Sequence, residues 1–147
     1  MLKRTKIVSL LEADQPIEKV LVKGWVRTRR DAKDFSFIEL NDGSSLKNIQ
    51  IIANNNLSNY EEVKKITTGS SLAVTGALVE SKGGNQKYEI VAGEIEIYSL
   101  APDDFPLQKK KHTDEYLRTI AHLRPRTNKY GAAFRVRSEL SFAIHNF

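Results

Sequence analysis

The sequence has 147 residues, of which 40% are hydrophobic and 28% are charged. This composition supplies enough apolar material for a packed core and excludes a chain that is disordered throughout. No apolar run approaches the roughly 20 residues of a membrane span, and residues 1–16 hold neither a long apolar stretch nor a small-residue cleavage site. Cysteine is absent, which excludes disulfides, thiolate zinc sites and cysteine nucleophiles. We therefore expect a cytoplasmic protein without a membrane segment.

The net charge of +5 and the isoelectric point near 9.4 favour an anionic partner, but the charge is unevenly placed. Residues 107–147 hold nine Lys or Arg and three Asp or Glu, a balance of +6. Residues 1–106 hold the other 14 basic and 15 acidic residues, a balance of −1. Because this main body is close to neutral, nucleic-acid binding there would depend on a local group of side chains and not on a general basic coat.

Hydrophobic periodicity predicts the elements of the main body in chain order. Ser58, followed three residues later by Glu61, is typical of a capping box and predicts a helix between the third and fourth strands. Ala92 and Gly93 interrupt the last strand, where a bulge would bend it. The predicted elements are helices at residues 5–13 and 57–66, strands at 18–30, 35–40, 46–53, 71–80 and 86–100, and a hairpin loop at 81–85.

Five strands with a helix between the third and the fourth have the element order of an OB-fold, a partly open Greek-key barrel of this size. We therefore predict an all-β fold: a five-stranded OB-fold barrel with an N-terminal helix, followed by C-terminal helical segments. The length of the first strand and the bend in the fifth both suit the closure of a barrel.

The sequence changes character after the fifth strand. Residues 101–106 form a linker punctuated by proline, and residues 114–122 are typical of a short helix. From Tyr130 apolar residues recur at helical spacing as far as Phe147, with no glycine, proline or polar turn to end the helix, so we expect it to continue further. The predicted organisation is a barrel domain at residues 1–100, a linker and hinge at 101–129, and the start of another domain at 130–147.

Two aromatic residues fall on the outer face of the predicted barrel. Alternation along the second strand places Ile38 and Leu40 inside, and Phe35 and Phe37 outside. Outward aromatic rings on a sheet can stack on unpaired bases, each stack being worth about 1–3 kcal/mol. The alternative is that the two rings lie under a loop or a neighbouring domain.

Polar residues on the neighbouring strands supply further candidates. Gln50 faces outward, where its amide can pair with a base edge, although a solvated strand residue would look the same. Three arginines near the end of the first strand can hold phosphates, and the alternative is an exposed, charged strand end. Neither a metal-ligand spacing of the histidines nor a Ser/His/Asp arrangement is found, so no catalytic or metal-binding residue is predicted. The three arginines are Arg27, Arg29 and Arg30.

Five segments of the sequence form a recognisable set. They are Gly24-Trp25-Val26 with Arg27, Arg29 and Arg30; Phe37-Ile38-Glu39-Leu40; Ile49-Gln50; Ala121-His122-Leu123-Arg124-Pro125-Arg126-Thr127-Asn128; and Phe134-Arg135-Val136-Arg137-Ser138. The first three resemble the anticodon-binding OB domain of the aspartyl, asparaginyl and lysyl subgroup of class II aminoacyl-tRNA synthetases. The fourth resembles the hinge of asparaginyl-tRNA synthetases, and the fifth resembles the motif 1 helix that opens their catalytic domain. The resemblance covers essentially the whole chain.

This resemblance implies roles at matching positions. Phe37 is similar to the aromatic residue that stacks on the central anticodon base, and Gln50 to the amide that reads that uridine. Glu89 is similar in placement to a carboxylate that contacts the anticodon. Asparagine and aspartate anticodons share their first two bases, so these residues do not separate the two amino acids. The residues implied to grip the RNA backbone or to flank the first anticodon base are Arg27, Arg29 and Arg30.

The resemblance also implies what the intact enzyme does. It would ligate asparagine to its tRNA with ATP and Mg²⁺, bind the anticodon loop of tRNA(Asn), and form a homodimer. The motif 2 loop and the motif 3 arginine that this reaction needs are not in the sequence, and motif 1 lacks its following strand and proline. We therefore expect this chain to have no ligase activity by itself and to bind no cofactor.

Three other interpretations stay open. The barrel would also suit an aspartyl-tRNA synthetase. A stand-alone OB module for single-stranded nucleic acid would use the same rings without preference for a base. A protein-interaction barrel would use Phe35 and Phe37 as a docking patch.

Overall fold

The computed structural model describes residues 2–84 and 86–147. The chain forms two compact units, Met1–Phe105 and Pro106–Phe147. Asn85, which belongs to the predicted hairpin loop at 81–85, lies outside the described residues. Among the helices that are described, none is both long enough and apolar enough to cross a membrane.

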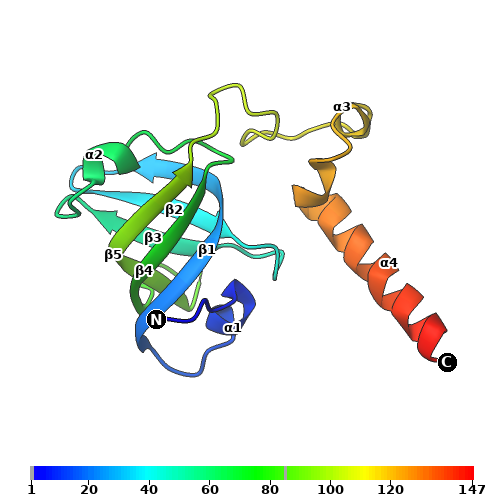
Figure 1. Ribbon diagram of the computed structural model, residues 1–147, viewed down its shortest axis with the longest axis horizontal. Coiled ribbons are helices and arrows are strands. Elements are labelled where there is room, and N and C mark those ends of the chain that lie inside the picture. The colour runs from blue at the N-terminus through cyan, green and yellow to red at the C-terminus, as the bar shows by residue number, and fades with distance from the viewer. Residues whose placement is uncertain (1, 85) are drawn as a thin grey trace. The chain divides into compact units, whose positions relative to one another are not determined.

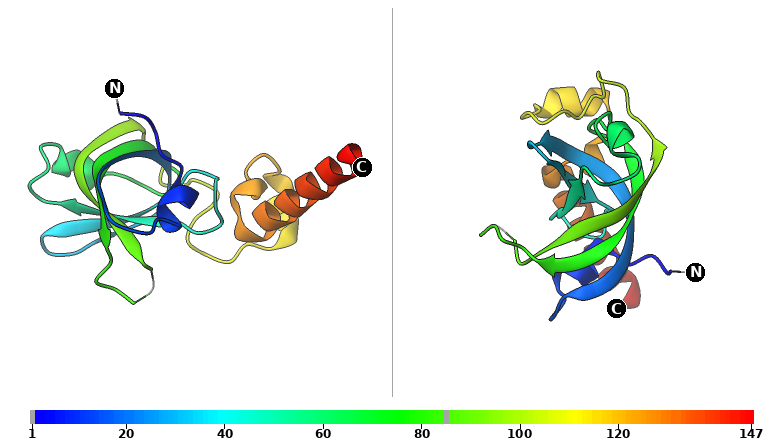
Figure 2. Two further views of the ribbon diagram at one scale, coloured as in Figure 1. Left: turned by 90° about the horizontal axis from the view of Figure 1, so that it is seen from below. Right: turned by 90° about the vertical axis from the view of Figure 1, so that its left-hand side faces the viewer.

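The first unit is a closed barrel (Figures 1 and 2). Its strands are arranged in the order β1-β2-β3-β5-β4, and the β3–β5 pair is parallel. The long strand β1 pairs with both β2 and β4, and thereby closes the barrel. The predicted order of five strands, with a helix between the third and the fourth, is confirmed. The elements of this unit are α1 (Ile7–Leu11), β1 (Ile17–Asp31), β2 (Phe35–Asn41), β3 (Ile49–Asn54), α2 (Tyr60–Val63), β4 (Ser71–Glu80) and β5 (Tyr88–Ser99).

Alternate residues of each strand meet in one apolar core. In β2 the side chains of Ile38 and Leu40 are buried, while those of Phe35 and Phe37 are half-buried on the other side. Burying a side chain of this size stabilises the fold by about 1.5–3 kcal/mol. The predicted inner and outer positions of β2 are therefore confirmed.

The strand β5 contains the predicted bulge. The register of the β4–β5 pair shifts next to Gly76, which pairs with Ala92 and leaves Gly93 as the extra residue. A Cβ atom added to Gly76 would lie 2.2 Å from the carbonyl oxygen of Val91. The two strands therefore approach so closely here that only glycine leaves room for the backbone of β5.

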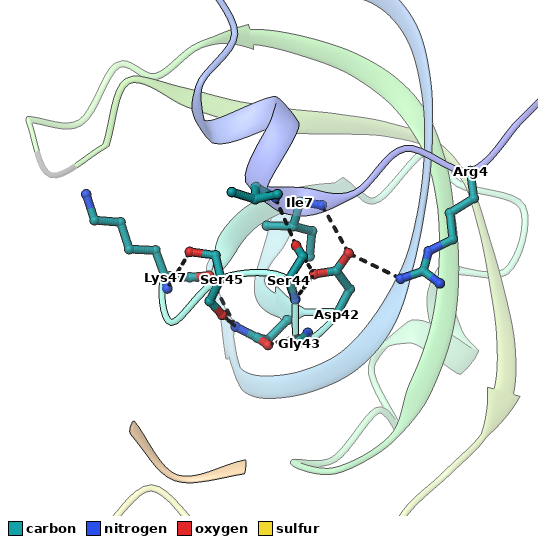
Figure 3. A network of polar contacts seen from close by, with 9 residues as sticks. Arg4, Ile7, Asp42, Gly43, Ser44, Ser45 and Lys47 are labelled. Atoms are coloured by element: carbon teal, nitrogen blue, oxygen red, sulfur yellow. Dashed lines mark hydrogen bonds and ion pairs between the residues drawn. The ribbon is translucent and has the colours of Figure 1, made fainter. Parts of the chain in front are cut away.

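The loop between β2 and β3 holds helix α1 at one end of the barrel (Figure 3). Asp42 Oδ2 accepts hydrogen bonds from the backbone N–H of Ile7 (3.1 Å) and from Arg4 Nη2 (3.2 Å), and Ser44 Oγ accepts one from the N–H of Val8 (3.0 Å). The first N–H groups of a helix have no partner within the helix, so these side chains replace a local cap. Burial opposes the charged form of Asp42, but the hydrogen bonds it accepts outweigh burial and hold the pKa of the carboxyl below its ordinary value of 3.8.

The third strand begins later than predicted, at Ile49 instead of residue 46. The reason is the side chain of Asn41, whose Nδ2 donates to the carbonyl oxygens of Ser45 (3.1 Å) and Lys47 (3.2 Å). Because these carbonyl groups are satisfied within the loop, they do not join the ladder of strand hydrogen bonds.

The predicted helix at 57–66 is a single turn in the structure, and the predicted capping box at Ser58 is wrong. The N-cap residue is Asn59, which makes no side-chain cap bond. Instead, its Nδ2 donates to the carbonyl oxygen of Ile95 in β5 at 2.7 Å. Apolar packing accounts for the periodicity that suggested a longer helix. The buried apolar residues of the segment are Leu57, Val63 and Ile66.

The second unit is helical. Helix α3 begins after Thr113, whose Oγ1 accepts a hydrogen bond from the N–H of Tyr116. Thr127 caps helix α4 in the same way through the N–H of Tyr130. These caps satisfy N–H groups that a helix leaves without a partner, which explains where both helices start. The elements of this unit are α3 (Asp114–Thr119), the short 3-10 helix η1 (Arg124–Arg126) and α4 (Asn128–Asn146).

Helix α4 differs from the strands of the barrel in its burial. None of its residues, all of which the structure describes, is buried. The side chains that form the predicted apolar stripe are exposed, among them Val136, Leu140 and Ile144. The predicted helix is therefore present, and its apolar side chains from Val136 onward are not covered.

Candidate nucleic-acid interface

Phe37 lies on the outer face of the barrel, where it pairs with Arg30 of β1 on one side and with Ile52 of β3 on the other. The rings of Phe35 and Phe37 meet edge to face, with centroids 4.9 Å apart and planes at 89°. The guanidinium carbon of Arg30 lies over the Phe37 ring, 4.9 Å from its centroid. Because a cation is attracted to the face of an aromatic ring, these contacts hold the Phe37 ring from two directions.

Polar side chains follow on the same outer face, two residues further along β2 from Phe37. Glu39 of β2 pairs with Gln50 of β3. The parallel pairing of Ile51 with Ile90 places Glu89 of β5 beside Gln50 on its other flank. Because successive residues of a strand alternate between faces, Glu39, Gln50 and Glu89 all lie on the outer face. The amide of Gln50 therefore lies between two carboxylates.

Hydrogen bonds hold this row of polar groups in place. Gln50 Nε2 and Ser81 Oγ both donate to Glu89 Oε2, each at 3.0 Å. Asn48 Nδ2 donates to Glu39 Oε2 at 2.9 Å. Glu89 is 5% exposed, whereas Gln50 is half-buried. Gln50 is therefore the member of this pair that an incoming molecule can reach.

Arg29 and Arg30, two of the three arginines predicted to hold phosphates, lie on different faces of β1. A bulge at Arg27 shifts the register of β1. As a result, Arg29 pairs with a core-facing position while Arg30 lies on the outer face over the aromatic ring. Arg29 donates to the carbonyl oxygen of Val63 at 3.3 Å and forms an ion pair with Asp31 at 3.3 Å. Arg29 thus ties β1 to helix α2, whereas Arg30 lies over one ring of the aromatic pair.

Two residues of this surface escaped prediction. The sequence predicts Ser81 in a hairpin loop and Asn48 in a strand. In the structure, each donates a hydrogen bond to one of the carboxylates that flank Gln50. Serine and asparagine are ordinary turn residues, so their types carry no separate signal for this role. Within residues 2–84 and 86–147, no group of three or more acidic or histidine side chains is arranged to hold a metal ion.

The outer face of β1, β2 and β3 combines a flat aromatic ring, a guanidinium group and an amide within a few residues. Stacking on an aromatic ring, together with hydrogen bonds to base edges, is the usual way in which proteins bind unpaired bases. Such a face is typical of OB barrels that bind single-stranded nucleic acid.

Comparison with known families agrees with this class. The family of OB-fold nucleic acid binding domains named for the tRNA anticodon matches residues 20–98, more than half of the chain. The chain belongs to this family.

Individual relatives give a more specific similarity than the family does. The chain is 56% identical over 147 residues to the asparagine–tRNA ligase of Oleidesulfovibrio alaskensis. This match covers 99% of this chain and 32% of the relative. It is 53% identical over 144 residues to the asparagine–tRNA ligase of Geotalea uraniireducens. That match covers 98% of this chain and 31% of the relative. The chain spans about a third of the length of these relatives. The predicted resemblance to asparaginyl-tRNA synthetases is confirmed.

A solved structure shares the same fold. The crystal structure of asparaginyl-tRNA synthetase from Pyrococcus horikoshii matches 99% of this chain and 35% of its own chain, with a TM-score of 0.83 and 24% sequence identity. At this level of identity, the match supports the fold.

Proposed function

We propose that this chain is the N-terminal, anticodon-binding part of an asparagine–tRNA ligase, and that its barrel binds the anticodon loop of tRNA(Asn). The observation that carries the proposal is the placement of the Phe37 ring and the Gln50 amide on one outer face of a barrel of this family. The identity of more than half of the residues with asparagine–tRNA ligases supports asparagine over aspartate as the amino acid.

The two side chains divide the work of binding a base. A base that leaves the stack of the anticodon loop would lie flat on the Phe37 ring, which is already braced by Phe35 and Arg30. Its edge would then face the neighbouring strand, where Gln50 offers hydrogen-bonding groups. Stacking provides affinity for any base, and the amide provides preference for one of them.

Residues 1–106 are close to neutral, and most of the positive charge of the chain lies in residues 107–147. This distribution fits a site in which stacking and an amide bind the base, without a general positive charge.

We propose that residues 101–129 form the linker and hinge of the intact enzyme and that residues 130–147 open its catalytic domain. In that enzyme, which would be a cytoplasmic homodimer, ATP and Mg²⁺ would bind to segments that lie outside this sequence. The barrel would hold the anticodon while the distant catalytic site acts on the acceptor end.

Replacing Phe37 tests the proposal. Phe37→Ala should weaken binding of a tRNA(Asn) anticodon stem-loop by about 1–3 kcal/mol, because the stacking platform is lost. The dissociation constant can be measured by fluorescence anisotropy with the stem-loop labelled. Phe142→Ala is the matched control, since Phe142 is 68% exposed on α4 and its loss should leave binding unchanged.

The outcome separates the proposal from its rivals. A folded Phe37→Ala chain that binds the stem-loop normally would contradict the proposal and favour a docking surface for protein. Equal affinity for unrelated oligonucleotides would favour a stand-alone single-strand-binding module. Tighter binding of the tRNA(Asp) stem-loop would favour an aspartate enzyme.

A further inference from the structure

The linker that follows β5 stays on the barrel for its first residues. The ring of Phe105 lies against Gly69, in the turn at residues 67–70 between α2 and β4. A Cβ atom added to Gly69 would lie 2.7 Å from Cδ1 of this ring and 2.8 Å from its Cγ. Gly69 also has a φ of +94°, a conformation that other residues rarely adopt. The ring therefore rests on bare backbone, in a space that any side chain at residue 69 would fill.

Hydrogen bonds hold the start of the linker on the same turn. Thr67 Oγ1 donates to the carbonyl oxygen of Ala101 at 2.5 Å, and the N–H of Ala101 donates to Ser70 Oγ at 3.0 Å. Ser70 is 1% exposed, so this hydroxyl would lose a partner in a buried place if the linker moved away. The N–H of Phe105 donates to the carbonyl oxygen of Pro102 at 3.0 Å and closes a tight turn. The start of the linker is thus fixed at both of its ends.

The turn that holds the linker is also bonded to β1. The N–H of Gly69 donates to the carbonyl oxygen of Val26 at 2.8 Å, and the N–H of Val26 donates to the carbonyl oxygen of Ser70 at 2.8 Å. The bulge of β1 follows directly after Val26, and four residues further along Arg30 pairs with Phe37. One turn therefore connects the start of the linker to the strand that supports the aromatic ring of the outer face.

We propose that Gly69 and Phe105 are positioning residues, which fix the direction in which the linker leaves the barrel relative to the RNA-binding face. This proposal rests on the proposed function, because it concerns how the intact ligase uses a bound anticodon. Binding energy from a distant domain assists a reaction by placing the reacting end correctly, so the connection must begin at a fixed place. Residues 101–105 belong to the same compact unit as the barrel, and the hinge of the intact enzyme would then begin after them.

The substitution Phe105→Ala tests the anchor in the full chain. Without the ring the segment should open more often, and the backbone N–H of Ala101 should exchange with solvent about tenfold faster or more, as followed by NMR. Leu100→Ala is the matched control, because Leu100 is an apolar side chain beside the same segment but is 47% exposed. It should leave the exchange unchanged. Unchanged exchange at Ala101 in Phe105→Ala would overturn the proposal.

A pair of glycines separates contact with the ring from strain in the backbone. Gly43 also has a positive φ, of +81°, but a Cβ atom there would meet nothing within 4 Å. Gly69→Ala should therefore free the segment as Phe105→Ala does, whereas Gly43→Ala should strain its own turn and leave Ala101 protected. In a chain that already carries Phe105→Ala, Gly69→Ala should cause no further rise in exchange at Ala101. A further rise as large as the first would mean that the turn holds the linker without the ring, and the proposal would be wrong.

The positioning role is tested in the intact ligase that carries this chain. Phe105→Ala should lower kcat for charging of tRNA(Asn) on the order of tenfold, because fewer bound tRNA molecules present their acceptor end correctly. KM for the tRNA should change little. Formation of the aminoacyl-adenylate, a step without tRNA, should stay normal, whereas a general loss of folding would lower both activities together. Normal kcat in a variant whose Ala101 exchanges faster would show that the anchor does not position the tRNA.

Failure of the proposed function would give a different pattern. The Phe105→Ala chain should bind the tRNA(Asn) anticodon stem-loop as tightly as the unsubstituted chain, since the outer face is intact. A loss of affinity as large as the loss of kcat would contradict the positioning role. If the unsubstituted chain binds the stem-loop no better than unrelated RNA, the proposed function is wrong, while slow exchange at Ala101 and its dependence on Phe105 would still be observed.

Discussion

The barrel and helix α4 show the same kind of apolar periodicity with opposite results. In the barrel, inward residues such as Ile51 meet residues from other strands and are fully buried. In α4, residues at helical spacing such as Leu140 are exposed, and the helix as described buries no side chain. Periodicity therefore identifies the face of an element that is apolar, but it does not show whether the same unit provides the surface that covers it.

The largest expected difference between the two regions is in stability. Ile51→Ala should lower the free energy of unfolding by about 2–5 kcal/mol, because the site is 0% exposed and a cavity would remain. Leu140→Ala should change it by no more than about 0.5 kcal/mol, because Leu140 is 59% exposed. Urea denaturation followed by fluorescence of the single tryptophan, Trp25, measures the barrel, and far-UV circular dichroism also reports the helices. A loss at Leu140 equal to that at Ile51 would mean that α4 packs its apolar face within this chain.

A second substitution measures how tightly the barrel is closed. Gly76→Ala should destabilise the barrel by about 1–3 kcal/mol, since its new Cβ atom would lie 2.2 Å from the carbonyl oxygen of Val91. Gly84→Ala is the matched control, because a Cβ atom there would meet nothing within 4 Å. Thermal unfolding of the two variants compares them directly. Similar unfolding temperatures would show that β4 and β5 can separate at the bulge at little cost.

The smallest expected effect is a change in the stability of the fold with pH. One aspartate from each unit allows the comparison. The pKa values of Asp42 and Asp114 are both lowered from 3.8, in Asp42 by hydrogen bonds that outweigh burial and in Asp114 chiefly by a hydrogen bond from Lys129. A lowered pKa stabilises the folded chain fully above the unfolded value, and this contribution is lost as the pH falls through the folded value. Each contribution should therefore be present at neutral pH and disappear below pH 3.8.

The two aspartates should nevertheless differ in effect. The side chain of Asp42 is 1% exposed and caps helix α1, so Asp42→Asn should cost about 1 kcal/mol at neutral pH and flatten the loss of stability in acid. Asp114 lies on the surface, and Asp114→Asn should change stability less. Urea midpoints measured across the acid range would reveal both effects. Unchanged acid sensitivity in Asp42→Asn would show that the contact with α1 does not contribute to stability.

Much of the fold follows from local patterns in the sequence. Alternation of apolar residues predicted the inner and outer faces of β2, and the residue pair at the interruption of β5 predicted the bulge at Gly93. Both features depend on residues that are close together in the chain. The same alternation placed Phe37 and Gln50 on the outer face, so these two candidates for RNA binding required no knowledge of the tertiary structure.

Features that depend on distant partners were not predictable in the same way. The helix at Ser58 shortened to one turn because Asn59 bonds to the backbone of β5, 36 residues further along. A bulge at Arg27, which has no sequence signal comparable to Gly93, shifts the register of β1, so that Arg30 and not Arg29 lies on the outer face beside Phe37.

The sequence alone thus determined the class of fold and the side chains that line its outer face, because strand periodicity is a local property. Tertiary structure decided which of these side chains act together. The parallel pairing of β3 with β5 brings Glu89 to Gln50, 39 residues away, and this contact depends on strand register instead of local sequence.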